Sequence, residues 1–187
     1  MKRLFIAVDI KPGDRLKEAI ELVRKRLRKE RIKWVDPDQM HLTLSFLGDT
    51  PEEVIPQLVN GLQKPMAGHI AFNLILETLG VFKSVHDPHV IWIGCRESAP
   101  FQQIKKEIDK SLPEYGFEPE NRVFSPHLTL GRIKQLRQQN QLIQLITLNK
   151  DVIFQQQRIE YIVLYESRLN PEGPGYIPLH RFPLVST

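Results

Sequence analysis

The chain has 187 residues, of which 41% are hydrophobic and 26% are charged, so it is long enough to bury one sizeable core. Its apolar runs are too short to cross a bilayer, and no signal-peptide cleavage site follows Met1. We therefore expect a cytoplasmic protein without a membrane partner. The formal net charge of +4 favours a polyanionic partner only slightly. The single cysteine, Cys95, excludes an internal disulfide, and its apolar surroundings predict a buried structural thiol.

The first half of the chain begins with a strand pattern over residues 3–9, where apolar side chains alternate. A basic helix follows, with Asp14 as its expected N-cap and an apolar stripe that runs to Leu27. Thr50-Pro51-Glu52-Glu53 predicts the capped start of a second helix. Further strands are expected over residues 32–35, 41–47, 70–79 and 90–94.

In the second half, Ser98 is expected to begin a third helix that ends near Gly116. Residues 138–148 predict a glutamine-rich amphipathic helix, within a polar stretch, 135–144, that has no assigned role. Strand patterns are found over residues 124–133, over 152–164 as one long strand or a bulged pair, and over 176–185. This mixture predicts an α+β fold with mostly antiparallel strands.

One tetrapeptide occurs twice. His41-Leu42-Thr43-Leu44 recurs as His127-Leu128-Thr129-Leu130, 86 residues further on, which is close to half the chain length. Both copies lie in predicted strands, so the spacing suggests two similar lobes related by a pseudo-two-fold axis. Because side chains alternate along a strand, each histidine shares a face with its threonine, while the leucines point into the core.

Two imidazoles and two threonine hydroxyls in one cleft suit phosphate-ester chemistry. Near neutral pH one imidazole can activate water while the other protonates the leaving oxygen. We expect the reactive nitrogens to lie on opposite sides of phosphorus, with Thr43 and Thr129 donating to its non-bridging oxygens. Arg132 follows on the opposite face of a regular strand, and a bulge at Gly131 would turn its guanidinium towards the phosphate.

The other histidines offer no such pattern. His69 and His180 look like surface or strand-edge residues, and His86 and His89 flank the turn at Pro88.

The paired His-x-Thr-x motifs resemble the 2H phosphoesterase family, in its RNA 2′,3′-cyclic phosphodiesterase branch, historically named 2′-5′ RNA ligases. The resemblance extends along most of the chain in an ordered set of short segments. These are residues 3–7, Trp34-Val35, 41–48, Ser125-Pro126, Gly131-Arg132, 164–169 and 173–176.

The resemblance implies a single bilobal domain over residues 1–187 in which antiparallel sheets line a central groove, with helices on the outside. The approximate lobes are 1–95 and 96–187, and we allow for strand exchange between them. The implied reaction is hydrolysis of an RNA terminal 2′,3′-cyclic phosphate, or of a small cyclic nucleotide, to a 2′-phosphate. In this comparison His41 is the proton donor to the 3′-oxygen and His127 the proton acceptor. The expected enzyme is a monomer that uses neither a metal cofactor nor ATP.

Two alternatives remain open at this point. A zinc hydrolase would need three protein ligands, commonly at His-Glu-x-x-His spacing, and the sequence contains no such motif. An RNA-binding module without catalysis would use the basic helix together with Phe46, Phe82 or Tyr176 for stacking. Such a module does not require two matched imidazoles.

Overall fold

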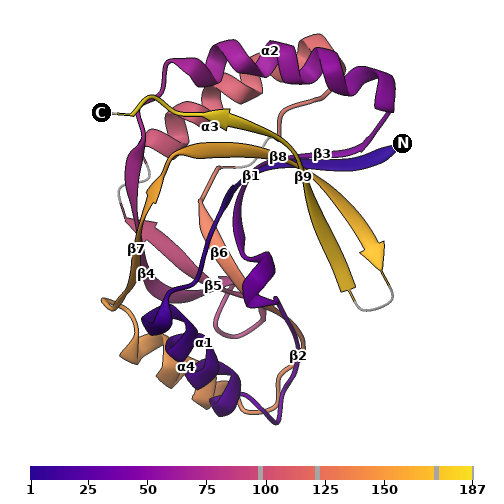
Figure 1. Cartoon of the computed structure of the whole chain (residues 1–187). Helices are drawn as coiled ribbons and strands as arrows, with labels where there is room; N and C mark the ends of the chain where they lie inside the picture. The colour runs from indigo at the N-terminus through magenta and orange to yellow at the C-terminus, as the bar shows by residue number, and fades with distance from the viewer. Residues whose placement is uncertain (97–98, 121–122, 171–172, 187) are drawn as a thin grey trace.

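A computed structural model of the chain describes residues 1–96, 99–120, 123–170 and 173–186 (Figure 1). The helices are α1 (Asp14–Arg26), α2 (Ile55–Ala67), α3 (Ala99–Ser111) and α4 (Gln139–Leu148). The strands are β1 (Lys2–Asp9), β2 (Arg31–Trp34), β3 (His41–Thr50), β4 (Phe72–Lys83), β5 (Pro88–Arg96), β6 (His127–Gln135), β7 (Ile153–Ile159), β8 (Tyr161–Asn170) and β9 (Gly173–Pro183). The fold is therefore α+β, as the sequence predicted.

The strands form two antiparallel sheets. Sheet A has the order β3-β1-β8-β9, and sheet B has the order β2-β6-β5-β4-β7. Each sheet thus combines strands from both halves of the chain: β8 and β9 join the first strands, and β2 joins the later ones. The exchange of strands ties the two sheets together covalently at several places.

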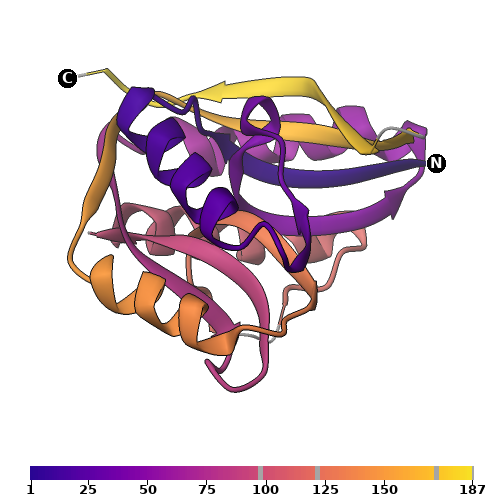
Figure 2. The same ribbon diagram turned by 90° about the horizontal axis from the view of Figure 1, so that it is seen from below.

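Each sheet is covered by its own pair of helices. In Figure 1, α2 and α3 lie above sheet A, where they contact β9 and β3, and α1 and α4 lie below sheet B, where they contact β7 and β4. Figure 2, which is seen from below, has α1 and α4 in the foreground and α2 and α3 behind the strands. Alternating residues of the strands and the apolar stripes of the helices supply the core, which includes Leu4, Leu16, Leu58, Phe101 and Leu142. The helices cover the outer faces of the two sheets. The inner faces, which carry the motif histidines, therefore face each other.

Two predicted helix caps are wrong. Asp14 is the first residue of α1, and the cap position belongs to Gly13, without a side-chain hydrogen bond. Thr50 remains in β3, and its hydroxyl donates to the carbonyl of Gly48 at 3.2 Å. A short 3₁₀ turn, Glu52–Val54, precedes α2 instead. Thr50 pairs with Lys2 in the ladder between β3 and β1, so pairing within the sheet outweighs the local preference for a cap at this residue.

The long pattern over residues 152–164 corresponds to two strands, β7 and β8, which belong to different sheets. Ser98, the expected start of the third helix, lies outside the described residues. α3 ends at Ser111, and a 3₁₀ helix, Leu112–Tyr115, continues it to Gly116, whose positive φ of +83° closes the last turn. In the part of the chain that the structure describes, no helix has the length and apolar character to cross a membrane.

Candidate active site

The two copies of the repeated motif lie on β3 and β6, which contact each other across the two sheets. His41, Thr43, His127 and Thr129 all line one groove of about 870 Å³. The alternating leucines of the motif are buried, as the strand pattern requires. The structure therefore brings all four residues of the predicted histidine–threonine set into a single cavity.

Both imidazoles are held in the same way. Nδ1 of His41 is 2.9 Å from the carbonyl oxygen of Gln39, and Nδ1 of His127 is 2.7 Å from that of Ser125. In each case the carbonyl belongs to the residue two positions earlier in the chain. A carbonyl oxygen only accepts hydrogen bonds, so each Nδ1 carries a hydrogen. Nε2 of each ring is thereby the nitrogen available for chemistry.

The groove lowers the pKa of both histidines. Burial is the main cause at His41, the charge of His127 lowers its pKa further, and the Gln39 carbonyl and Asp9 act in the opposite direction. At His127 burial again lowers the pKa, with an added contribution from Arg132, while the Ser125 carbonyl opposes it. A proton is thus easily given up by either ring.

Aromatic rings support each imidazole. Phe5 and Tyr176 both have ring centroids 4.9 Å from that of His41, with Tyr176 in edge contact. In sheet B, the ring of Phe82 on β4 contacts that of His127 on β6 edge-on, with 4.5 Å between the ring centroids. These contacts restrict the rotation of the imidazoles and exclude water from part of their surface.

A bulge turns Arg132 into the groove. In the pairing of β6 with β5, Thr129 lies opposite Trp92 and Gly131 opposite Ile91, so Leu130 is an extra, unpaired residue. The predicted bulge is therefore present one residue earlier than Gly131. It moves Arg132 to the face of the strand that carries His127, and Arg132 lines the groove.

The same bulge occurs in the first motif. Between β1 and β3, Ala7 lies opposite Thr43 and Ile6 opposite Ser45, which leaves Leu44 as the extra residue. The residue five positions after His41 is Phe46, which also lines the groove and is 45% exposed. The motifs are thus equivalent in backbone as well as in sequence, but they present Phe46 at one place and Arg132 at the other.

Lys105 is a groove residue that the sequence did not reveal. It lines the groove from α3, is only 6% exposed and pairs with Asp109 at 2.6 Å to one carboxylate oxygen. A lysine and an aspartate four residues apart, beside the apolar stripe of a helix, are a weak signal that could have marked it. Lys33 and Arg132 add to its positive charge in the groove. The carboxylates of Asp36 and Glu120, which also line the groove, oppose it.

The remaining histidines lie elsewhere in the described structure. His69, expected at the surface or at a strand edge, is only 9% exposed and directly precedes the bridge between Ile70 and Val185. Its Nε2 lies 3.0 Å from a carboxylate oxygen of Glu107. His89 pairs with Asp87 in the turn before β5, and His180 packs against Phe182. Cys95 is half-buried, its thiol donates to the carbonyl of Pro126, and burial raises its pKa to about 12. A thiol with such a pKa is a poor nucleophile.

Within the described residues, no group of three or more His, Cys, Asp or Glu side chains is arranged to hold a metal ion. The groove instead offers imidazoles, hydroxyls and cations. This donor set fits a phosphate diester, since the cations attract its charge and the imidazoles can exchange protons with its oxygens.

Comparison with known proteins gives a consistent result. Residues 12–168 match the family model described as 2′-5′ RNA ligase superfamily. Proteins named RNA 2′,3′-cyclic phosphodiesterase are similar over nearly their whole length. The protein of Methanocaldococcus jannaschii is 34% identical, with 93% of this chain and 96% of the relative covered. That of Methanothermobacter thermautotrophicus is 30% identical, with 97% and 98% covered.

Solved structures show the same fold. Escherichia coli LigT in complex with 3′-AMP superposes with a TM-score of 0.78 at 25% identity, covering 98% of each chain. A protein of Thermus thermophilus gives a TM-score of 0.77 at 27% identity, covering 97% of each chain.

Proposed function

Because the chain belongs to the 2′-5′ RNA ligase superfamily, we propose that it hydrolyses the 2′,3′-cyclic phosphate at the end of an RNA strand to a 2′-phosphomonoester, with His41 and His127 as an acid–base pair. Curated relatives carry the name of this reaction. The observation that carries the proposal is that both histidines line one groove with Nδ1 bound to a carbonyl oxygen. With Nδ1 bound in this way, Nε2 of each ring is the nitrogen proposed to exchange protons with the substrate.

The proposed reaction needs only these two rings and one water molecule. Neutral His127 accepts a proton from water at Nε2 while the water oxygen forms a bond to phosphorus. The bond from phosphorus to the 3′-oxygen breaks at the same time, and protonated His41 gives its Nε2 proton to the departing oxygen. The product is a 2′-phosphate and a 3′-hydroxyl, and exchange with solvent returns both rings to their starting states.

Thr43, Thr129 and Arg132 are proposed to hold the phosphate. Their hydroxyls and guanidinium line the same groove as the histidines. A cyclic phosphate carries one negative charge, and further charge builds on its non-bridging oxygens as water adds. Donors already in place for those oxygens stabilise the transition state without reorganisation.

With a 5′-hydroxyl in place of water, the same acid–base pair would form a 2′-5′ phosphodiester from a cyclic phosphate, so reverse ligation is part of the proposal. The reaction as written has no step for a metal ion or ATP, and a single chain supplies every group named. We therefore propose that the enzyme acts as a monomer without metal or ATP.

The test is incubation with RNA that ends in a 2′,3′-cyclic phosphate, in the presence of EDTA, followed by identification of the phosphomonoester isomer. We expect 2′-phosphate, and turnover that is unchanged by the chelator. His41→Asn and His127→Asn should abolish most turnover and retain RNA binding. His86→Asn is the matched control, because His86 is an exposed histidine of the turn at Pro88. Retained turnover in both groove variants would instead favour the non-catalytic RNA-binding module.

A further inference from the structure

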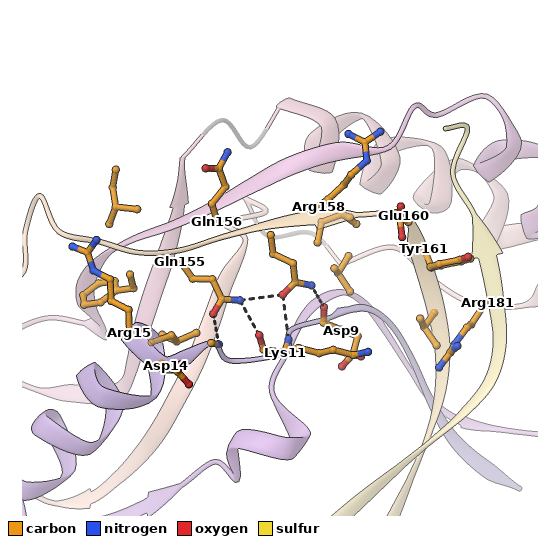
Figure 3. A pocket seen from close by; sticks show the side chains of 18 of the residues that line it. Asp9, Lys11, Asp14, Arg15, Gln155, Gln156, Arg158, Glu160, Tyr161 and Arg181 are labelled. Atoms are coloured by element: carbon orange, nitrogen blue, oxygen red, sulfur yellow. Dashed lines mark hydrogen bonds between the residues drawn. The ribbon is translucent and has the colours of Figure 1, made fainter. Parts of the chain in front are cut away.

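A second pocket, of about 810 Å³, lies near the catalytic groove (Figure 3). It is formed by the end of β1, the start of α1, strand β7 and the adjoining parts of β8 and β9. Four cationic side chains line it, namely Lys11, Arg15, Arg158 and Arg181, together with three carboxylates, Asp9, Asp14 and Glu160. Two tyrosines, Tyr161 and Tyr165, and three glutamines, Gln155, Gln156 and Gln157, also line it.

The pocket and the groove share one face of sheet A. Asp9 lies opposite His41 in the pairing of β1 with β3, and Phe5 lies opposite Tyr165 in that of β1 with β8. Arg181 lies opposite Val163, two residues from Tyr165. Since residues at even spacing along a paired strand share a face, these side chains lie on the same side of the sheet as His41.

A stack of rings connects the two cavities. The ring of Phe5 is 4.9 Å from that of His41 and stacks on Tyr165 at 5.2 Å, with an angle of 16° between the planes. Tyr176, which lines the groove, contacts the same Phe5 ring at 5.1 Å. Tyr165 and Tyr176 therefore flank one buried phenylalanine, one on the side of each cavity.

Two glutamines of β7 hold the segment that follows β1 and lines the pocket. Gln155 accepts from the backbone N–H of Gly13 at 2.7 Å and donates to the carbonyl of Lys11 at 2.9 Å. Gln157 donates to the carbonyl of Asp9 at 2.8 Å, and the two glutamine side chains are themselves joined, as the dashed lines in Figure 3 show. The chain that leaves β1 is thus fixed relative to His41, and so is the pocket.

Other residues of the pocket are exposed to solvent and can contact a ligand. Tyr161 is 47% exposed, and Arg181 and Arg15 are exposed. Neither arginine forms a salt bridge with a carboxylate in the described part of the chain. Tyr161 and Tyr165 are four residues apart on β8, about 13 Å along a strand, which is long enough to follow a few nucleotides. Exposed aromatic rings beside cations are the usual surface for single-stranded nucleic acid.

Resting on the proposed function, we infer that this pocket binds the nucleotides upstream of the cyclic phosphate in a single-stranded RNA substrate. The terminal nucleotide occupies the groove, and the strand continues past Tyr165 to Tyr161 and Arg181. Tyr161 offers its ring to a base, and Arg181 and Arg15 offer charge to phosphates. The enzyme then prefers an oligonucleotide to a mononucleotide with the same reactive end.

The inference is tested by comparing two substrates, a nucleoside 2′,3′-cyclic monophosphate and a short single-stranded RNA that ends in a 2′,3′-cyclic phosphate. Tyr161→Ala and Arg181→Gln should each raise KM for the RNA about tenfold and leave both constants for the mononucleotide within about twofold. Arg181→Gln should also reduce the slope of log KM against log salt concentration by about 0.7, the value for one contact to a single strand. Arg28→Gln, which removes an exposed charge just after α1, is the control and should leave kcat and KM for both substrates unchanged.

Binding measurements separate this inference from the proposed function. The same RNA with a 2′-phosphate end and a fluorescent label should bind the wild-type chain more tightly than Arg181→Gln, whether or not any substrate is turned over. If the wild type turns over neither substrate, the proposed function is wrong, and the binding comparison still decides the inference. Equal effects of the substitutions on both substrates, or equal RNA binding by wild type and variant, would overturn it.

Discussion

Replacing the two histidines of the groove one at a time should have opposite effects on the pH dependence of kcat/KM. In the proposed mechanism, kcat/KM requires protonated His41 and neutral His127, so it should follow a bell-shaped curve in pH. A histidine with a pKa of about 6.5 is about 24% protonated at pH 7. Because burial lowers the pKa of both rings, the acid form is scarcer still at neutral pH. The optimum should therefore lie below pH 6.5, with a descending limb of about tenfold per unit above it.

His41→Asn removes the acid and should abolish the descending limb, so that kcat/KM rises with pH to a plateau. His127→Asn removes the base and should leave only the descending limb. Each change should reduce kcat/KM at the optimum about 10²- to 10⁴-fold, or about 3 to 5.5 kcal/mol. The assay is the initial rate on subsaturating cyclic-phosphate RNA from pH 4.5 to pH 8.5. If both variants keep a complete bell, or both lose the same limb, the assignment of acid and base is refuted.

Substitutions at Thr43, Thr129 and Arg132 test the groove, and one at Gly80 tests the packing of sheet B. Thr43→Val and Thr129→Val should each reduce kcat about tenfold, while serine at either position restores most of it, as initial rates will show. Arg132→Gln should lower kcat/KM about 100-fold and Arg132→Lys less, because lysine keeps the charge without the planar fork. A Cβ on Gly80 would lie 2.3 Å from the ring of Trp92, so Gly80→Ala should reduce the free energy of unfolding by about 1–3 kcal/mol in denaturant titrations. An unchanged unfolding midpoint would show that the ring moves without cost.

The sequence predicted the placement of the motif residues better than it predicted the connections around them. The tetrapeptide repeat and its alternation placed His41 and His127 on strands with their leucines in the core, which depends only on the period of a strand. The bulges at Leu44 and Leu130 were not predictable in this way. A bulge is defined by which partner residues it lies between, and those partners come from β1 and β5.

The division of residues 152–164 between two sheets was hidden for a similar reason. Local pattern indicates a strand but not the sheet to which it belongs, and the sheet is decided by pairing with distant segments. Gln155 and Gln157 appeared only as polar residues of a strand, whereas in the fold they hold the segment that follows β1. Their role depends on contacts across more than 140 residues of sequence.

The two histidines have matching backbones but unequal charged neighbours, and this difference provides a physical reason for their roles. Burial is the largest effect and lowers the pKa of both histidines. The smaller effects of charge differ, because Asp9 raises the pKa of His41 whereas Arg132 lowers that of His127. A nearby carboxylate favours a ring that holds a proton and a nearby guanidinium favours one that does not. The local charges thus favour His41 as the acid and His127 as the base, independently of any likeness to known enzymes.

Asp9→Asn isolates this effect. The substitution removes the carboxylate beside His41 and leaves the backbone carbonyl of Asp9, which accepts from Gln157. The pKa of His41 should fall, so the descending limb of the pH profile should move to lower pH while the ascending limb stays in place. Activity at neutral pH should decrease accordingly, whereas activity near the acidic optimum changes little. Asp49→Asn, which changes an exposed carboxylate near the end of β3 that lines neither cavity, is the control. A shift of the ascending limb alone would mean that Asp9 acts on the base, and that His41 and His127 have the opposite roles.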